Sequence, residues 1–184
     1  MYMKVLPPVF LASAFAVSSS AALAANDGSI EITGRIVATT CNVEGQAPGG
    51  GAVKKSVGLD GISVAKLAAP GDVAGDKGFL IVVGGNDDCA DGLKAKIRFD
   101  PSSPAMDRTA GRLNIDAAAD AAKNVQIEIA NGDGTPIHLF TGESRPVVIE
   151  GHRATIELLA RYYSLGGATQ GTANSRVGFQ VVYD

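Results

Sequence analysis

The sequence is poor in the residues from which most binding and catalytic sites are built. It contains no tryptophan, only 5% aromatic residues and two histidines, His138 and His152, which do not have the spacing of zinc ligands. Aromatic rings are needed to stack on sugars, and a Ser-His-Asp site needs a histidine beside its nucleophile. The composition therefore argues against a lectin, an enzyme and a zinc protein, and we expect no cofactor.

The sequence also lacks an excess of charge of one sign. The formal net charge is -3 over 184 residues, the isoelectric point is near 5.4, and no long run of like charges occurs. A protein that binds nucleic acid needs a basic field that gathers phosphates. We therefore expect no nucleic-acid partner.

Two polar segments have the residue types of a cation site. Asp87, Asp88 and Asp91 form a carboxylate cluster, but a solvated turn is the simpler interpretation. Residues 131–135 imitate the start of a calcium loop, but the twelfth position is Gly142, where a bidentate glutamate is required. Neither segment predicts a metal site.

The first 24 residues have the layout of a secretory signal peptide. Lys4 precedes an apolar block from Val5 to Val17, and a stretch of mostly small residues ends in Ala22-Leu23-Ala24. A membrane anchor is the alternative, but Pro7-Pro8 interrupts the roughly 20 apolar residues that a spanning helix needs. We expect residues 1–24 to be removed and the remainder to be exported.

Cysteine is scarce as well, with Cys41 and Cys89 as the only pair. An exported chain meets an oxidising compartment, where an even number of cysteines is expected to form disulfides. A catalytic or metal-binding cysteine is the alternative, but it would need histidine or further cysteine partners. We therefore predict one disulfide, worth about 4 kcal/mol by the loop-entropy estimate.

Alternation of apolar and polar residues is the dominant pattern of the remaining chain, and it predicts half-buried β-strands. The unbroken apolar run Phe79–Val83 predicts a central strand that is covered on both faces. The alanine-rich stretch Ala117–Lys123 is too short for a stable helix, so a loop is expected there. Short strands separated by glycine- and asparagine-rich turns indicate an all-β sandwich. The alternating rows are Ala95, Ile97 and Phe99; Val125, Ile127 and Ile129; Ala154, Ile156, Leu158, Ala160 and Tyr162; and Val177, Phe179, Val181 and Tyr183.

The two ends of the exported chain carry the most specific patterns. Near the start, Gly28, Ile30 and Ile32 share one face of a strand-like segment before the first cysteine. Near the end, Gly171 stands fourteenth from the C-terminus and Tyr183 is penultimate, after the sequence 160–163, Ala-Arg-Tyr-Tyr. In this order and spacing, the chain resembles the major subunits of type 1 fimbriae, which are assembled by the chaperone-usher route.

The resemblance implies an incomplete immunoglobulin-like β-sandwich that is completed by a donor strand from another chain. Residues 25–37 would form an N-terminal donor-strand extension, with Gly28, Ile30 and Ile32 facing inward, and residues 38–184 the pilin domain. The groove that receives the strand would be bordered by the C-terminal segment. The residues implied for that segment are Gly171, Val177, Phe179, Val181 and Tyr183.

The resemblance also implies partners and a location. The partners would be neighbouring subunits in a head-to-tail polymer, a periplasmic chaperone and an outer-membrane usher. The chain would pass through the periplasm of a Gram-negative bacterium to a fimbria on the cell surface and would support adhesion. A minor pilin or adaptor, or a tip adhesin that binds carbohydrate, is the alternative role, and the sequence does not specify a receptor.

Overall fold

The computed structural model describes residues 41–184, all of which lie in one compact unit, Arg35–Asp184. The predicted signal peptide and donor-strand extension lie outside these residues. The described chain is built from eight strands and one short 3-10 helix. In chain order these are η1 (Val64–Leu67), β1 (Val73–Gly84), β2 (Lys94–Phe99), β3 (Met106–Asp107), β4 (Arg112–Asn114), β5 (Val125–Asn131), β6 (Val147–Val148), β7 (Arg153–Ser164) and β8 (Phe179–Tyr183).

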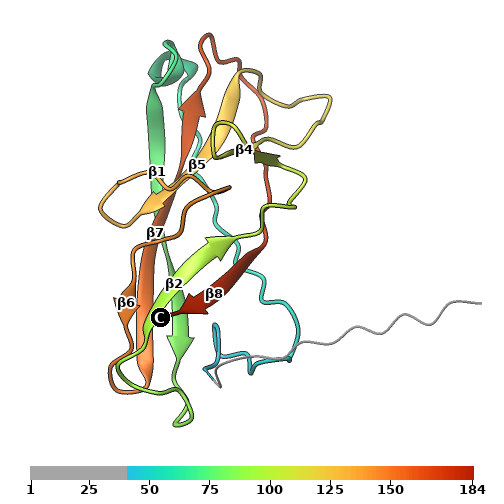
Figure 1. Ribbon diagram of the computed structural model, residues 1–184. Helices are drawn as coiled ribbons and strands as arrows, with labels where there is room; N and C mark the ends of the chain where they lie inside the picture. The colour runs from blue at the N-terminus through green and yellow to red at the C-terminus, as the bar shows by residue number, and fades with distance from the viewer. Residues whose placement is uncertain (1–40) are drawn as a thin grey trace, which may run out of the picture. The chain divides into compact units, whose positions relative to one another are not determined.

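The strands form two antiparallel sheets (Figure 1). The first has the order β1-β7-β5-β4-β3, and the second has the order β6-β2-β8. The longest ladder joins β1 to β7, from the pair Val73 and Tyr163 to the pair Gly84 and Arg153. This architecture confirms the prediction of an all-β fold.

The core lies where the inward faces of the two sheets meet. Ile81 and Val83 of β1 and Ile156 of β7 belong to the same buried cluster as Ile97 and Phe99 of β2, and each is at most 4% exposed. Complete burial of such a side chain contributes roughly 1.5 to 3 kcal/mol. The alternating rows in β2, β7 and β8 thus form inward-facing positions, as the sequence predicts.

The apolar run Phe79–Val83 does not form a central strand, and that prediction is wrong. It lies in β1, which is the edge strand of the five-stranded sheet. Ile81 and Val83 point into the core, whereas Leu80 is 46% exposed. An unbroken apolar run shows only that both faces are apolar, and here solvent covers part of one of them.

β5 is buried on both faces, whereas the alternation in the sequence predicts a strand with one face exposed to solvent. Gln126 and Glu128 point away from the sandwich core but are 2% and 5% exposed. The side chain of Gln126 accepts a hydrogen bond from Arg112 Nε at 2.9 Å, and Glu128 accepts one from Arg161 Nε at 2.8 Å. Long cationic side chains on the neighbouring strands therefore cover a face that the alternation marked as solvated.

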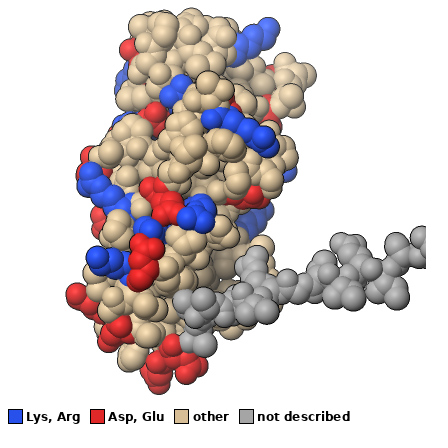
Figure 2. All heavy atoms as spheres, in the orientation of Figure 1, with Lys and Arg blue, Asp and Glu red and all other residues tan. Residues whose placement is uncertain are grey.

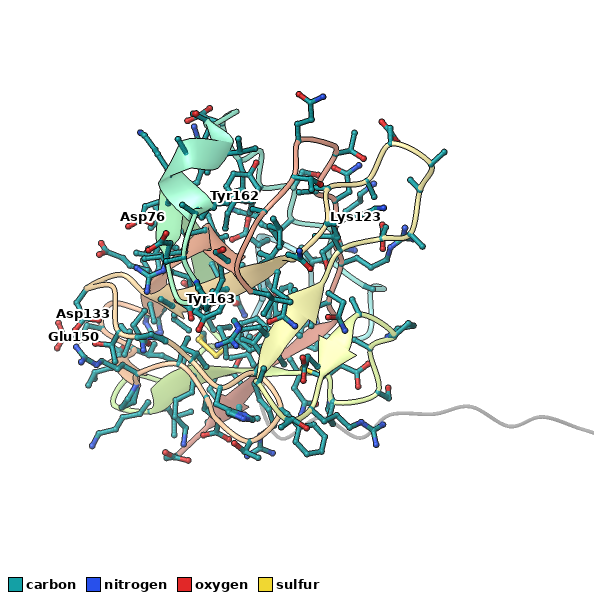
Figure 3. All side chains as sticks on the ribbon, turned by 90° about the horizontal axis from the view of Figure 1, so that it is seen from above. Asp76, Lys123, Asp133, Glu150, Tyr162 and Tyr163 are labelled. Carbon is teal, nitrogen blue, oxygen red and sulfur yellow. A yellow bond between two sulfur atoms is a disulfide. The ribbon has the colours of Figure 1, made fainter. Side chains whose placement is uncertain are left out.

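The predicted disulfide joins Cys41 to Cys89, next to the end of β1 (yellow in Figure 3). The chain is tightly packed at this point, since a Cβ atom on Gly84 would lie 2.1 Å from the backbone oxygen of His152 and 3.0 Å from Cys89 Sγ. Gly84 also has a φ of 87°, which favours glycine. The stretch Ala117–Lys123 contains turns and no helix, as expected.

Candidate functional site

β8 is an edge strand whose second side is not paired with any described strand. On its first side it pairs with β2 in a continuous register, from Tyr183 opposite Ala95 to Phe179 opposite Phe99. An edge of this kind exposes backbone N–H and C=O groups that can pair with another strand. The position of β8 beside β2 is visible in Figure 1.

The inward-facing side chains of β8 and the residue before it are only partly covered. Val177, Phe179, Val181 and Tyr183, which we call the β8 row, pack against the main core cluster but remain partly exposed. The equivalent positions on β2 are almost completely buried, with 0% exposure for Ala95 and 1% for Ile97. The core is therefore covered over β2 and incompletely covered over β8.

The irregular segment 51–62 lies beside β1, since Lys77 Nζ is 3.2 Å from the carboxylate of Asp60. Val57 and Leu59 pack against the main cluster, again without becoming fully buried. No backbone–backbone hydrogen bond within the described chain involves residues 51–62. No prediction from the sequence covers this segment, although the spacing of Val57 and Leu59 is the two-residue period of a strand.

A hollow of about 370 Å³ lies where the chain enters the β8 row. Ala105 and Ile115 are among its apolar lining residues, and Arg176 and Asp116 form an ion pair beside them at 2.8 Å. The carboxylate of Asp116 raises the pKa of Arg176 by accepting its hydrogen bond. The hollow thus combines an apolar lining with one exposed ion pair.

The far end of β8 is anchored to β2. The backbone of Asp184 exchanges hydrogen bonds with that of Lys94 at 3.0 and 3.1 Å. Lys96 Nζ lies 2.6 Å from the carboxylate of Asp184 and 2.9 Å from that of Glu143. Hydrogen bonds to Asp184 and then Glu143 raise the pKa of Lys96, so its cation holds both carboxylates.

Gly171 lies outside β8, in the loop that precedes the β8 row. Its φ is 153°, and a Cβ atom there would lie 2.3 Å from the amide nitrogen of Ala122 and 2.5 Å from the carbonyl oxygen of Asp120. The loop is tied to this segment by a hydrogen bond from Thr172 N to Asp120 O. The structure therefore places a steric requirement for glycine at this position, away from the β8 row.

The two acidic segments form turns. Asp133 accepts a hydrogen bond from Thr135 N at 3.1 Å and forms an ion pair with Arg145, and Asp91 accepts one from His152 N at 2.6 Å. Within residues 41–184, no group of three or more His, Cys, Asp or Glu side chains has the geometry of a metal site. The residues predicted for the donor strand, Gly28, Ile30 and Ile32, lie outside the described range.

The surface carries charges of both signs. Figure 2 shows acidic and basic side chains interspersed on the face in view, without a broad basic patch. No helix of the described residues is long and apolar enough to cross a membrane.

The sequence is similar to those of known proteins along most of its length. A model of the family described as "Fimbrial protein" matches residues 30–184. The chain is 31% identical to the F17 fimbrial protein of Escherichia coli over 182 residues, which covers 95% of this chain and 97% of that protein. It is 32% identical to the type-1 fimbrial protein, A chain, of Escherichia coli K12 over 195 residues, which covers 100% of both.

Solved structures share the fold at lower identity. The P pilus rod subunit PapA matches with a TM-score of 0.53 and 16% identity, over 79% of this chain and 99% of that one. A subunit in the structure of a chaperone-usher pilus matches with a TM-score of 0.55 and 13% identity, over 90% of this chain and 100% of that one. These two similarities support the fold.

Proposed function

Because the chain belongs to the fimbrial protein family, we propose that its β8 edge receives a strand from the N-terminal segment of a neighbouring copy. The chain is a structural subunit of a pilus and is not an enzyme, and it polymerises with other subunits at the cell surface. The proposal assigns the joint between subunits to one edge of one strand. A contact between two different surfaces does not close on itself, so its repetition gives a filament.

The incomplete cover of the β8 row is the observation that carries this proposal. Phe179 and Val181 are partly exposed, whereas Ile97 on the paired strand is 1% exposed. A donor strand that places Ile30 and Ile32 on the β8 row would bury two side chains, each worth roughly 1.5 to 3 kcal/mol. Each ladder hydrogen bond to β8 would add about 0.5 to 1.5 kcal/mol.

The same edge explains the need for other partners before assembly. An unpaired strand with a partly exposed apolar row associates with other chains unless something covers it. A periplasmic chaperone would cover the β8 edge after export, and the donor strand of the next subunit would replace it at an outer-membrane usher. This order supplies each subunit with a pairing strand at every stage.

The test is a tailed chain, in which a copy of residues 27–36 follows Asp184 through a flexible linker. If the copy pairs with β8, the tailed chain should melt well above the untailed exported chain. A matched control carries a tail in which both Ile30 and Ile32 are replaced by Asp, which removes the apolar contacts and keeps the length. Equal melting temperatures for all three chains would contradict the proposal.

A further inference from the structure

β1 is also an edge strand of the described sheets, so, like β8, it could pair with a strand of another chain. Among the described strands it pairs only with β7, and it carries Leu80 with 46% exposure. An open edge with an exposed apolar residue accepts strands from other chains. A subunit that polymerises by adding a strand needs only one edge that accepts it. Contacts that cover the β1 edge would therefore direct the strand to β8.

Glu44 occupies the edge of β1 near its C-terminal end. Its amide donates to the carbonyl oxygen of Val82 at 2.8 Å, and its carboxylate accepts from the amide of Val82 at 2.7 Å. The amide of Gly84 donates to the carbonyl oxygen of Asn42 at 2.7 Å. One side chain and a short backbone segment thus satisfy the outward groups of Val82 and the Gly84 amide.

The backbone conformation of Glu44 indicates that its carboxylate matters. Glu44 and Gly45 are the central residues of a two-residue turn between Val43 and Gln46, with φ values of 51° and 80°. Asparagine and glycine are preferred where such turns need positive φ. Glutamate fits this conformation poorly, but its carboxylate reaches both Val82 N and Lys55 Nζ, the latter at 2.8 Å.

The charge of Glu44 is maintained by the same contacts. Burial raises the pKa of its carboxyl group, but the hydrogen bonds from Lys55 and from the Val82 amide, together with the charge of Lys55, lower the pKa by more. The carboxylate is therefore ionised at neutral pH and remains a strong acceptor for the edge amide.

A β-bulge interrupts the edge of β1 near its N-terminal end. Ala74 pairs with Tyr162 and Lys77 with Ala160, so β1 has one residue more than β7 between these pairs. Gly75 has a φ of 78°, and a Cβ atom there would lie 3.0 Å from the ring of Tyr162. Bulges and charged residues both prevent edge strands from pairing.

Charged side chains follow Gly75 at this bulge. Asp76 lies at the margin of the molecule in Figure 3, 3.8 Å from Arg161. Lys77 Nζ pairs with Asp60 at 3.2 Å, and the hydroxyl of Tyr162 donates to the carbonyl oxygen of Asp60 at 3.3 Å. The bulge is therefore bordered by two charges and tied to segment 51–62.

Only a short part of the β1 edge remains open between these two features. By the alternation of an antiparallel ladder, Gly78 and Leu80 direct their backbone groups to the same side as Val82. No described residue forms a backbone hydrogen bond with them on that side. Three residues, Gly78–Leu80, make a strand at the lower limit of length.

From these contacts we infer that Glu44 and the bulge at Gly75–Lys77 close the β1 edge to strand addition, so that a donor strand pairs with β8. This inference rests on the proposed function, because it concerns the choice between two edges for the same strand. It makes Glu44 and the bulge residues determinants of specificity that lie away from the joint itself.

The experiment uses the tailed chain, whose own tail occupies β8, and a fluorescent peptide with the sequence of residues 27–36. The tailed wild type should take up little peptide. Glu44→Gly removes the carboxylate but suits the positive φ, so the turn should persist and peptide uptake should rise about tenfold, the ratio that one strong hydrogen bond supports. Hydrogen exchange locates the peptide, since binding to β1 protects the amides of Gly78, Leu80 and Val82.

Two control variants separate the carboxylate contact from other effects. Glu44→Gln keeps an acceptor for the Val82 amide and should remain closed, and Lys55→Ala removes only the ion pair and should also remain closed. A folded Glu44→Gly chain that takes up no more peptide than wild type would overturn the inference. Equal uptake by the Gly and Gln variants would overturn it as well.

If Glu44→Gly does not fold, a second variant tests whether the bulge closes the β1 edge. Asp76→Ala combined with Lys77→Ala removes the charges at the bulge and should increase protection of the amides of Gly78 and Leu80 by the peptide. Unchanged exchange there would overturn the inference. A tail that fails to protect the amides of β8 in any chain would instead contradict the proposed function, so the two failures are distinguishable.

Discussion

The edges of β1 and β8 lie in different sheets of one sandwich and differ in how much of their backbone other residues cover. Along β1, the contacts of the described residues leave only Gly78–Leu80 open between Glu44 and the bulge at Gly75, and the inward side chains Ile81 and Val83 are buried. Along β8, no described strand, bulge or capping carboxylate interrupts the edge, and the inward row is partly exposed. If β8 receives the donor strand as proposed, the difference implies that a receptive edge requires both accessible backbone groups and an incompletely covered core.

Removing the disulfide should cause the largest loss of stability, and it should also loosen the residues that close the β1 edge. Cys41→Ala with Cys89→Ala should lower the free energy of unfolding by about 4 kcal/mol, because the loop it closes is long. Cys41 directly precedes the segment that caps β1, so that cap should also loosen. Urea denaturation of the tailed chain, with and without reductant for the wild type, measures the loss.

The pairing itself is checked by alkylation of the secreted protein without reductant, followed by mass measurement. Two modified cysteines in the wild type would contradict the disulfide.

Truncating a side chain of the β8 row should destabilise the tailed chain, in which a strand covers the row, more than the untailed chain. Phe179→Ala should cost about 3 kcal/mol where a strand covers the row, since a buried phenylalanine is lost. The untailed chain should lose less, because Phe179 is already partly exposed there. The melting temperatures of tailed and untailed variants measure both losses, with the exposed neighbour Gln180→Ala as the control.

The donor segment should show a smaller, face-dependent effect. In the predicted donor strand Gly28 would share the inward face with Ile30, so Gly28→Leu should overpack the joint by about 1 to 3 kcal/mol and reduce fibre yield. Glu31 would lie on the outward face of that strand, so Glu31→Leu should assemble almost normally. Electron microscopy of cells that express each variant gives the yield, and wild-type yield from Gly28→Leu would leave Gly28 with a role in chain flexibility only.

The smallest expected effect is a pH dependence beside the end of β1. The Cys89 carbonyl, 2.8 Å from Nδ1 of His152, raises the pKa of this histidine, as does the nearby Asp91. A raised pKa means that the contribution is fully present below the ordinary value of 6.5 and is lost as pH rises through the folded value. Between pH 6 and 8, His152→Asn should flatten the stability profile in urea, and an unchanged slope would contradict this role.

The alternation of residues predicted most of the fold, because a sandwich buries every second residue. The rows in β2, β7 and β8 were identified this way, and the two cysteines were sufficient to predict their pairing. The same alternation did not distinguish an edge strand from a central one, so β1 was misplaced. It also missed the second buried face of β5, since that face is covered by Arg112 and Arg161 from other strands.

The candidate site was predicted in part. Val177, Phe179, Val181 and Tyr183 pack partly buried against the core, while their role in receiving a strand stays a prediction. The reason for Gly171 depends on a contact with residues 120–122 that no local pattern reveals. Glu44 was not identified, because a glutamate before a glycine is an ordinary sequence. Its role depends on positive φ and on an amide 38 residues away, which only the folded chain brings together.

The disulfide also determines how a fimbria would carry mechanical load. A pull on the chain that precedes Cys41 passes through the covalent link directly to Cys89, which is 48 residues further along the sequence. Residues 42–88, including the Glu44 turn, segment 51–62 and the whole of β1, then lie in a loop that bears no tension. Stretching would therefore not extend this loop, which limits the length that one subunit can release.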